Sequence, residues 1–251
     1  MKKTATIILA AGQGTRMKSE KPKVVHELAG KAMINRVIDT AFKLDSDLIA
    51  VVVGYKKDIV IDTVPANAKI RFVEQNVQKG TGHAVMMCED AFQNFAGNVF
   101  ILCGDVPLLR YQTLQKMQQQ HEEQQAACTV LTAVMDDALK YGRIIRNSEG
   151  NVLKIVEFKD AGDAEKEIHE INTGIYCYDA KSLFEALKYV NSNNMQNEYY
   201  LTDTLEILNA QGKLVTSVIL DDMVEASGVN SSEELANLEQ EFYLREKHFT
   251  T

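Results

Sequence analysis

The chain has 251 residues, of which 45% are hydrophobic and 25% are charged, and its formal net charge is -8. This composition is that of an ordinary soluble globular protein, and the length suits one large core. An acidic chain without a long basic stripe is a poor candidate for binding nucleic acid. No apolar run approaches the ~18 residues that cross a membrane, and the first such run is too short for a signal peptide. We therefore expect a cytoplasmic protein with no membrane partner.

The chain has four cysteines, which are widely spaced and form no C-x-x-C pair: Cys88, Cys103, Cys128 and Cys177. A zinc site or a disulfide framework needs closer or more regular spacing. We expect reduced thiols within the core.

Apolar runs alternate with amphipathic segments over the first half of the chain. Short runs, some rich in β-branched residues, predict strands at residues 4–9, 48–53, 70–73 and 99–102. Apolar residues recur at helical spacing over residues 32–43, and a helix is also expected over 84–92. This alternation predicts an α/β fold that is Rossmann-like and doubly wound, with a mixed, mainly parallel sheet.

The pattern changes after a polar, glutamine-rich helix expected over residues 113–122. Further strands are predicted at 126–134, 142–146, 152–157, 173–178 and 215–220, with a turn cluster at 147–150 and a helix at 182–189. Ser231 and Glu234 fit a capping box that opens a C-terminal helix. We expect the later strands to continue the same sheet, so that residues 1–230 form one domain and residues 231–251 a terminal helix.

The segment after the first strand is rich in small and basic residues. Gly12 and Gly14 predict a tight turn, because glycine has no Cβ and accepts positive φ, and such a turn presents backbone N–H groups that bind anions. Four basic residues then follow: Arg16, Lys18, Lys21 and Lys23. The lysine–hydroxyl pair of the P-loop is absent, and Met17 replaces the third glycine of the dinucleotide fingerprint. The segment therefore predicts a phosphate-binding loop of another kind.

Polar residues also follow two other predicted strands. The third strand ends at Gln75, and the fourth ends at Cys103 and Asp105. Sheets of this type bind ligands at the carboxyl ends of their strands. We expect these residues and the glycine loop to meet at one edge of the sheet.

Several segments resemble, in this order, the motifs of sugar-nucleotide pyrophosphorylases, which are nucleotidyltransferases. The resemblance runs from the start of the chain to about residue 230, and it is closest to the N-acetylglucosamine-1-phosphate uridylyltransferase domains of bacterial bifunctional enzymes. The matching segments are LAAGQGTRM at 9–17, PK at 22–23, Gln75, GTGHA at 80–84, GDVPL at 104–108, YGRI at 141–144, Glu157, EINTG at 170–174 and EYYLTD at 198–203.

The resemblance implies a role for each matching residue. Arg16 and Lys23 would be catalytic, with Arg16 on the leaving pyrophosphate and Lys23 on the phosphates near the reacting centre. A first set of residues would bind the nucleotide in a part spanning about residues 1–110: Leu9, Ala10, Ala11, Gly12, Gln75, Gly80, Thr81, Cys103, Gly104 and Asp105. A second set would bind the sugar in a part spanning about residues 111–230: Gly142, Glu157, Asn172, Tyr200 and Thr202.

The resemblance also implies a metal site, with Asp105 and Asn230 as ligands of Mg²⁺. Mg²⁺ prefers one or two protein oxygens together with phosphates and water. Without the resemblance, Asp105 would cap a turn, Asn230 would cap the following helix and Gln75 would be a surface glutamine. Cys103 stands where some relatives have an aromatic residue, which leaves one ribose contact open.

The implied reaction joins UTP and N-acetylglucosamine 1-phosphate into UDP-N-acetylglucosamine and pyrophosphate, a step in peptidoglycan synthesis for the cell wall. The attacking phosphate is already an anion, so no general base is needed, and His26 and His83 are expected to be structural. Three alternatives stay open at this point. The chain could transfer another nucleotide or act on another sugar or alditol phosphate, it could bind nucleotide sugars without catalysis, or it could be a structural subunit.

The bifunctional relatives continue into a left-handed β-helix of hexapeptide repeats, which acetylates glucosamine 1-phosphate and forms a trimer. No hexapeptide repeat occurs in these 251 residues, and such architectures need several stacked repeats. We therefore expect no acetyltransferase domain, no use of acetyl-CoA and a monomer or weak association. Whether the chain is a single-function enzyme or a fragment of a longer chain stays open.

Overall fold

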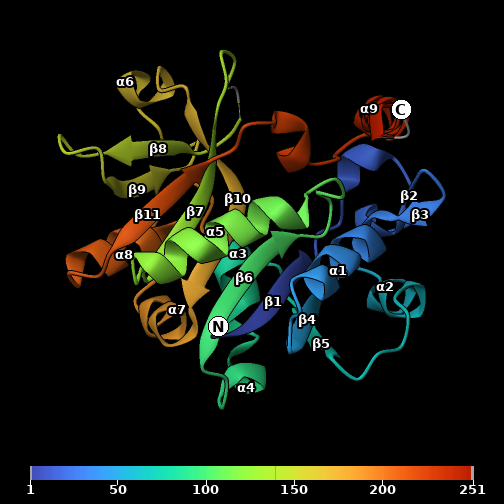
Figure 1. The fold of residues 1–251 in the computed structure, drawn as a ribbon, viewed down its shortest axis with the longest axis horizontal. Coiled ribbons are helices and arrows are strands. Elements are labelled where there is room, and N and C mark those ends of the chain that lie inside the picture. Colours follow the sequence, from blue (N-terminus) through green and yellow to red (C-terminus); the bar gives the residue numbers. More distant parts are fainter. Residues whose placement is uncertain (1, 139, 250–251) are drawn as a thin grey trace.

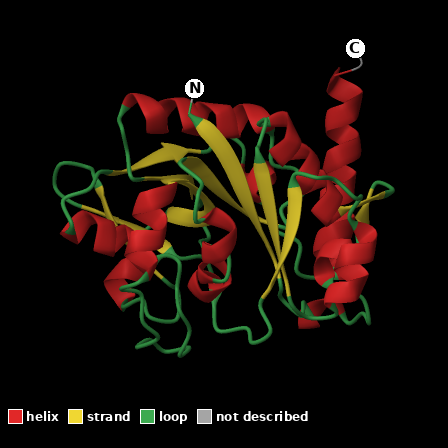
Figure 2. Cartoon of the chain, turned by 90° about the horizontal axis from the view of Figure 1, so that it is seen from below, coloured by secondary structure: helices red, strands yellow, loops and turns green. Residues whose placement is uncertain are grey.

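The computed structural model describes residues 2–138 and 140–249, and a mixed sheet lies between two layers of helices (Figures 1 and 2). Within these residues the sheet has nine strands, and its main path has the order β11-β7-β10-β6-β1-β4-β5. The strands β1 (Lys3–Ala10), β4 (Leu48–Val53), β5 (Ile70–Glu74) and β6 (Gly97–Cys103) are parallel neighbours. The predicted fold class is confirmed.

The second half of the chain extends this sheet. The long strand β10 (Glu170–Asp179) pairs antiparallel with β6 on one side and with β7 (Cys128–Val134) on the other. Beyond it, β11 (Val215–Ile219) runs parallel to β7, and the hairpin of β8 (Arg143–Arg146) and β9 (Val152–Val156) branches from β10. The two halves therefore share one continuous sheet.

Alternation along the central strand explains the two helical layers. Ile8 of β1 packs into a core with α1 (Met33–Lys43), α2 (Lys57–Thr63) and α5 (Tyr111–Glu123). Its neighbour Ile7 points to the other face, where α3 (Thr81–Met86), α4 (Glu89–Phe92), α7 (Ala180–Leu187) and α8 (Asp203–Ala210) lie. Because successive side chains of a strand point to opposite faces, an apolar run buries both faces of the sheet.

The remaining elements lie at the edges of these layers. A small hairpin of β2 (Glu27–Leu28) and β3 (Lys31–Ala32) precedes α1, and α6 (Asp163–Lys166) lies between β9 and β10. The C-terminal helix α9 (Ser232–Phe249) packs near β2 through Leu28 and Leu238. Within the described residues, no helix has both the length and the apolar character that crossing a bilayer requires. All four cysteines carry free thiols, as predicted.

The structure differs from the predicted elements in two respects. The helix expected over residues 84–92 is divided into α3 and α4, because the N–H of Cys88 bonds to the Val85 carbonyl at 2.9 Å and tightens the turn. The helices α2, α6 and α8 and the hairpin of β2 and β3 were not predicted. Each of these helices is short and buries few side chains, so the helical period is weak in all three segments. Each strand of the hairpin has only two residues, which is too short for a strand pattern.

Candidate active site

The glycine loop follows β1, and the backbone of this loop lies close to the side chain of Lys23. Gly14 has φ +64, and a Cβ added there would lie 2.5 Å from Cβ of Lys23. The loop therefore needs glycine at this position for both conformation and space. Gly12 does not have positive φ, and an added Cβ would meet nothing within 4 Å. Its missing side chain instead leaves open the cavity that it lines.

Lys23 joins two residues that are distant in the sequence. Its Nζ forms an ion pair with Asp105 and donates a hydrogen bond of 2.9 Å to Oδ1 of Asn230. Asp105 follows β6, whereas Asn230 precedes α9, and the N–H of Val229 holds the segments together by bonding to the Asp105 carbonyl at 3.0 Å. The predicted metal ligands thus converge on one point.

Asn230 does not cap the terminal helix. The cap is Ser231, whose Oγ accepts a hydrogen bond of 3.1 Å from the N–H of Glu234. The carboxylate of Glu234 in turn accepts from the N–H of Asn230 at 2.7 Å, one residue earlier than in the predicted capping box. The interpretation of Asn230 as a helix cap was therefore wrong, and its side chain is directed to Lys23.

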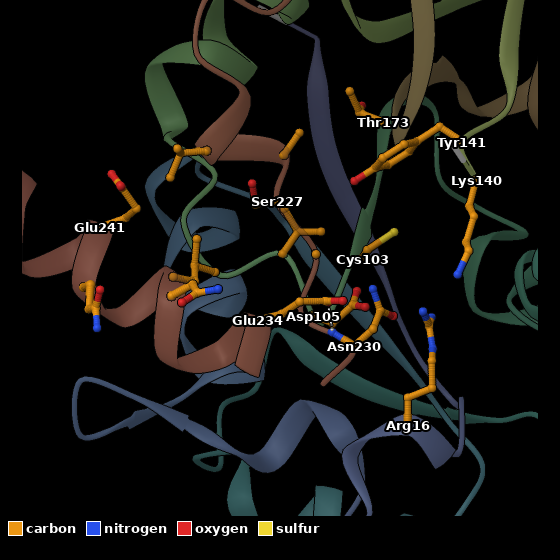
Figure 3. Close-up of a pocket in the computed structure, with 17 residues that line it drawn as sticks. Arg16, Cys103, Asp105, Lys140, Tyr141, Thr173, Ser227, Asn230, Glu234 and Glu241 are labelled. Carbon is orange, nitrogen blue, oxygen red and sulfur yellow. Dashed lines mark hydrogen bonds between the residues drawn. The ribbon is translucent and has the colours of Figure 1, made fainter. Parts of the chain in front are cut away.

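A large cavity of about 830 Å³ opens beside this cluster (Figure 3). Arg16, Cys103, Asp105 and Asn230 line it, with the guanidinium group of Arg16 beside Asn230. Burial raises the pKa of the Cys103 thiol to about 12, and the thiol donates to the Gly174 carbonyl at 3.6 Å. Cys103 therefore lines the cavity as a protonated thiol.

A second, smaller cavity of about 220 Å³ lies at the ends of β1 and β5. Leu9, Ala11 and Gly12 line one side, and Gln75 and the loop from Gly80 to Thr81 line the other. Gln75 is 3% exposed, so it is not a surface glutamine. Its Nε2 lies 3.1 Å from the Gly80 carbonyl oxygen and 3.0 Å from Nδ1 of His83.

Two predicted nucleotide-binding residues lie behind these cavities. Ala10 is buried and lines neither of them. The N–H of Gly104 bonds to the Leu9 carbonyl at 3.0 Å, and a Cβ at Gly104 would lie 3.1 Å from that oxygen. Leu9 is also the register partner of Cys103. The ends of β1, β5 and β6 thus bring the predicted segments to one edge of the sheet.

The predicted sugar-binding residues gather at the β8–β9 hairpin. Thr202 donates a hydrogen bond of 3.2 Å to Glu157, and the N–H of Asn172 bonds to the Gly142 carbonyl at 2.9 Å. A Cβ on Gly142 would lie 3.4 Å from Oε2 of Glu157, so the four residues adjoin one another. Burial raises the pKa of Glu157, opposed by the hydrogen bond from Thr202.

The remaining sugar candidate, Tyr200, is buried, and its hydroxyl bonds to Gln196 and Asp160 at 2.8 and 3.1 Å. The structure therefore does not direct this hydroxyl to Glu157. None of the five predicted sugar-binding residues lines the larger or the smaller cavity.

The donor set at Asp105 and Asn230 fits a hard divalent cation. A carboxylate oxygen and an amide oxygen face the same ammonium group, so both can face one cation. Across residues 2–138 and 140–249, no group of three or more His, Cys, Asp or Glu side chains converges on a point. A site with two protein oxygens suits Mg²⁺, which takes its other ligands from phosphates and water.

Several residues near the site were not predicted. Tyr141 and Lys140 line the larger cavity opposite Asp105, and Glu234 and Glu241 of α9 line another side (Figure 3). Tyr141 belongs to a matching motif and could have been found from it. The α9 residues carry no such signal, because only the tertiary fold brings the terminal helix to this edge.

These elements define a nucleotidyltransferase. Residues 5–225 match the nucleotidyl transferase family, so the chain belongs to that family.

The chain is also similar to two-function bacterial proteins. It is 46% identical over 250 residues to the bifunctional protein GlmU of Brevibacillus brevis, covering 100% of this chain and 53% of that protein. It is 47% identical over 232 residues to the protein of the same name from Syntrophotalea carbinolica, covering 92% of this chain and 50% of that protein. The chain thus spans about half the length of the curated relatives it matches.

Solved structures support the fold. UDP-glucose pyrophosphorylase in complex with UDP-glucose superimposes with a TM-score of 0.78 at 20% identity, covering 98% of this chain and 100% of that chain. Its apo form gives a TM-score of 0.79 at 19% identity, with the same coverage.

Proposed function

We propose that the chain transfers uridylyl from UTP to N-acetylglucosamine 1-phosphate, giving UDP-N-acetylglucosamine and pyrophosphate. The observation that carries the proposal is the convergence of Lys23, Asp105 and Asn230 beside the glycine loop, next to a cavity lined by Gln75. This arrangement offers cations for phosphates and an amide for a base on one edge of the sheet. The similarity to GlmU over nearly the whole chain supports the choice of substrates.

The reaction needs positioning and charge stabilisation more than acid–base chemistry. The sugar phosphate is an anion near neutral pH, so its oxygen attacks the α-phosphorus of UTP and pyrophosphate leaves. Holding two polyanions in line supplies roughly 7–11 kcal/mol. Arg16 and Lys23 stabilise charge that develops on the leaving and transferring phosphates, and such oriented cations form a large electrostatic contribution. Backbone N–H groups of the glycine loop add further donors.

We assign a divalent cation, Mg²⁺, to Asp105 and Asn230. When bound, the cation would supply positive charge that polarises phosphate oxygens. The Asp105 carboxylate contributes the negative charge that attracts it, and Asn230 contributes a neutral oxygen. The backbone hydrogen bond between Asp105 and Val229 holds these two ligands in place before substrate binds.

The sugar part of the proposal rests on Glu157 and the polar residues beside it. Glu157 and Thr202 present carboxylate and hydroxyl groups, which suit the hydroxyl and acetamido groups of a sugar. The side-chain amide of Asn172 donates to the Tyr176 hydroxyl at 2.7 Å and accepts from the Gly174 N–H at 3.0 Å, which fixes its orientation beside them. Burial of Glu157 makes a hydrogen bond to a sugar hydroxyl stronger than it would be in water.

One assay tests the proposal. Pyrophosphate release is measured with each of the four ribonucleoside triphosphates and with phosphates of N-acetylglucosamine, glucose and an alditol. We expect the highest kcat/KM for UTP with N-acetylglucosamine 1-phosphate, and loss of turnover on chelation of divalent cations. A higher kcat/KM with another pair would identify a different transferase of the family. Binding without pyrophosphate release from any pair would refute catalysis.

A further inference from the structure

His83 makes a contact that the proposed reaction does not use. Its Nδ1 lies 3.0 Å from Nε2 of Gln75, and its ring lines neither cavity. Gln75 does line the smaller cavity, although only 3% of it is exposed. The Gln75 side chain therefore connects the His83 ring to this cavity.

The surroundings of Gln75 identify the nitrogen end of its amide. The Gly80 carbonyl oxygen, which can only accept, lies 3.1 Å from Nε2. The same nitrogen faces Nδ1 of His83, so both of its hydrogens are used when Nδ1 accepts. This requires a neutral imidazole with its proton on the other ring nitrogen. Burial, together with the charge of Lys79, lowers the pKa of His83 and favours this neutral form.

The oxygen end of the amide is then directed to the cavity. Within the described part of the chain, Oε1 of Gln75 accepts no hydrogen bond and is not among the buried polar atoms that lack a partner. Since Gln75 lines the cavity, Oε1 is its accessible acceptor there. Uracil has a donor at N3, whereas cytosine has a lone pair at N3. An acceptor facing that atom bonds to uracil and repels cytosine.

We propose that His83 is a positioning residue for base selection, because its contact with Gln75 keeps Oε1 directed into the smaller cavity and so favours uracil over cytosine. The identity of the ligand rests on the proposed function. The Gly80 carbonyl alone supports the same amide orientation less firmly, since it occupies one of the two hydrogens. Loss of one neutral hydrogen bond changes an equilibrium by about fivefold. We expect a change of this size in the preference for UTP over CTP.

Titration calorimetry of the full chain with UTP and with CTP tests this inference. The measured quantity is the Kd for CTP divided by the Kd for UTP, so a lower ratio means a weaker preference for UTP. His83→Ala should reduce the preference for UTP about fivefold. His83→Asn should retain it, because the introduced amide oxygen is as many bonds from Cα as Nδ1 is. Met86→Ala is the matched control, since Met86 lies in the same helix and packs into the core. It should leave the ratio unchanged.

A double-mutant cycle separates positioning from a structural effect. With Gln75→Ala as the background, His83→Ala should no longer change the ratio, because there is no amide to orient. The inference is overturned if the parent does not prefer UTP, if His83→Ala lowers the ratio equally with and without Gln75, or if His83→Asn behaves as His83→Ala does. These binding ratios need no turnover. A chain that prefers UTP but releases no pyrophosphate would refute the proposed function and leave this inference standing.

Discussion

At the scale of single residues, Lys23 has a double role. In the structure its ammonium group neutralises Asp105 and bonds to Asn230, and the side chains of Lys23 and Asp105 are only 17% and 18% exposed. A cation bound by Asp105 and Asn230 would take the place of this ammonium group. Lys23 would then be available to a phosphate. The ion pair and the hydrogen bond therefore hold Asp105 and Asn230 close together before substrate arrives.

The charge of Asp105 gives the first prediction. Asp105→Asn keeps the size of the side chain but removes the anionic ligand, so we expect the fold to persist and kcat to fall about a hundredfold. Asp45→Asn is the control, because Asp45 forms an exposed pair with Lys69 at 3.3 Å, far from the site. Circular dichroism and pyrophosphate release measure the two effects. Turnover of Asp105→Asn within about threefold of the parent at limiting Mg²⁺ would contradict the metal assignment.

The sequence predicted the location of some of these residues but not the contacts of others. Asp105 and Gln75 each follow an apolar run, and the rule for ligands at strand ends predicts their location. The contact between Lys23 and Asn230 could not be derived from spacing, because it depends on how the terminal segment returns to the sheet. His83 was interpreted as structural. Its contact with Gln75 depends on the turn at Gly80, whose φ of +102 no pattern specifies.

At the scale of elements, the glycine loop gives the second prediction. Gly14→Ala places Cβ in a left-handed conformation, which costs about 1 kcal/mol, and also within 2.5 Å of Cβ of Lys23. Displacement of Lys23 should lower kcat about tenfold or more. Gly30→Ala is a close control, since Gly30 has φ +71 but an added Cβ there meets nothing within 4 Å. Gly14→Ala should lose at least as much stability in urea as Gly30→Ala, and only Gly14→Ala should lose turnover. Equal turnover would show that the loop does not position Lys23.

The segment Met223–Ala226 connects the site to α5 and gives the third prediction. Its Glu225 is 1% exposed and accepts hydrogen bonds from the Arg110 backbone and guanidinium group and from Thr113. Glu225→Ala removes all of these hydrogen bonds and should cost about 2 kcal/mol of unfolding free energy. Glu89→Ala removes an exposed pair with Lys188 at 3.9 Å and should cost less than about 0.5 kcal/mol. Urea denaturation of both variants compares these values. Similar losses of stability would refute a stabilising role for the contacts of Glu225 with Arg110 and Thr113.

The elements themselves were predicted best where one hydrophobic pattern covers the whole segment. The run at residues 48–53 is buried along nearly its whole length and forms β4 with the predicted bounds. The strand predicted at 173–178 extends from Glu170 to Asp179. Its first residues alternate between buried and half-buried, and Gly174 has φ +79 where the register with β7 shifts. A bulge of this kind interrupts the two-residue period that sequence analysis depends on.

At the scale of the whole molecule, one continuous sheet makes the stability of both halves a common property. Carboxylates that are buried in the second half therefore affect the unfolding of the entire chain. Asp203, at the start of α8, is the clearest case. Burial, followed by the nearby charges of Glu206 and Asp160, raises its pKa to about 6 from 3.8. Between these values the folded state holds a proton that the unfolded state has released, so stability falls as pH rises through this range.

The last prediction follows from this fall in stability with rising pH. Above about pH 6 both states have released the proton, and the folded chain bears the full cost of the buried charge; below about pH 4 neither state is charged there and the cost vanishes. Asp203→Asn should therefore stabilise the chain by about 1 kcal/mol at pH 8, a value reduced from the full shift because Asp203 is only half-buried. The gain should shrink to zero near pH 4. Urea denaturation of parent and variant at both pH values measures this gain.

Asp221→Asn is the control, since that side chain is 87% exposed and its replacement should change stability by less than about 0.5 kcal/mol at either pH. A gain of equal size at pH 4 and pH 8 would mean that the introduced amide packs better than the carboxylate for reasons unrelated to charge.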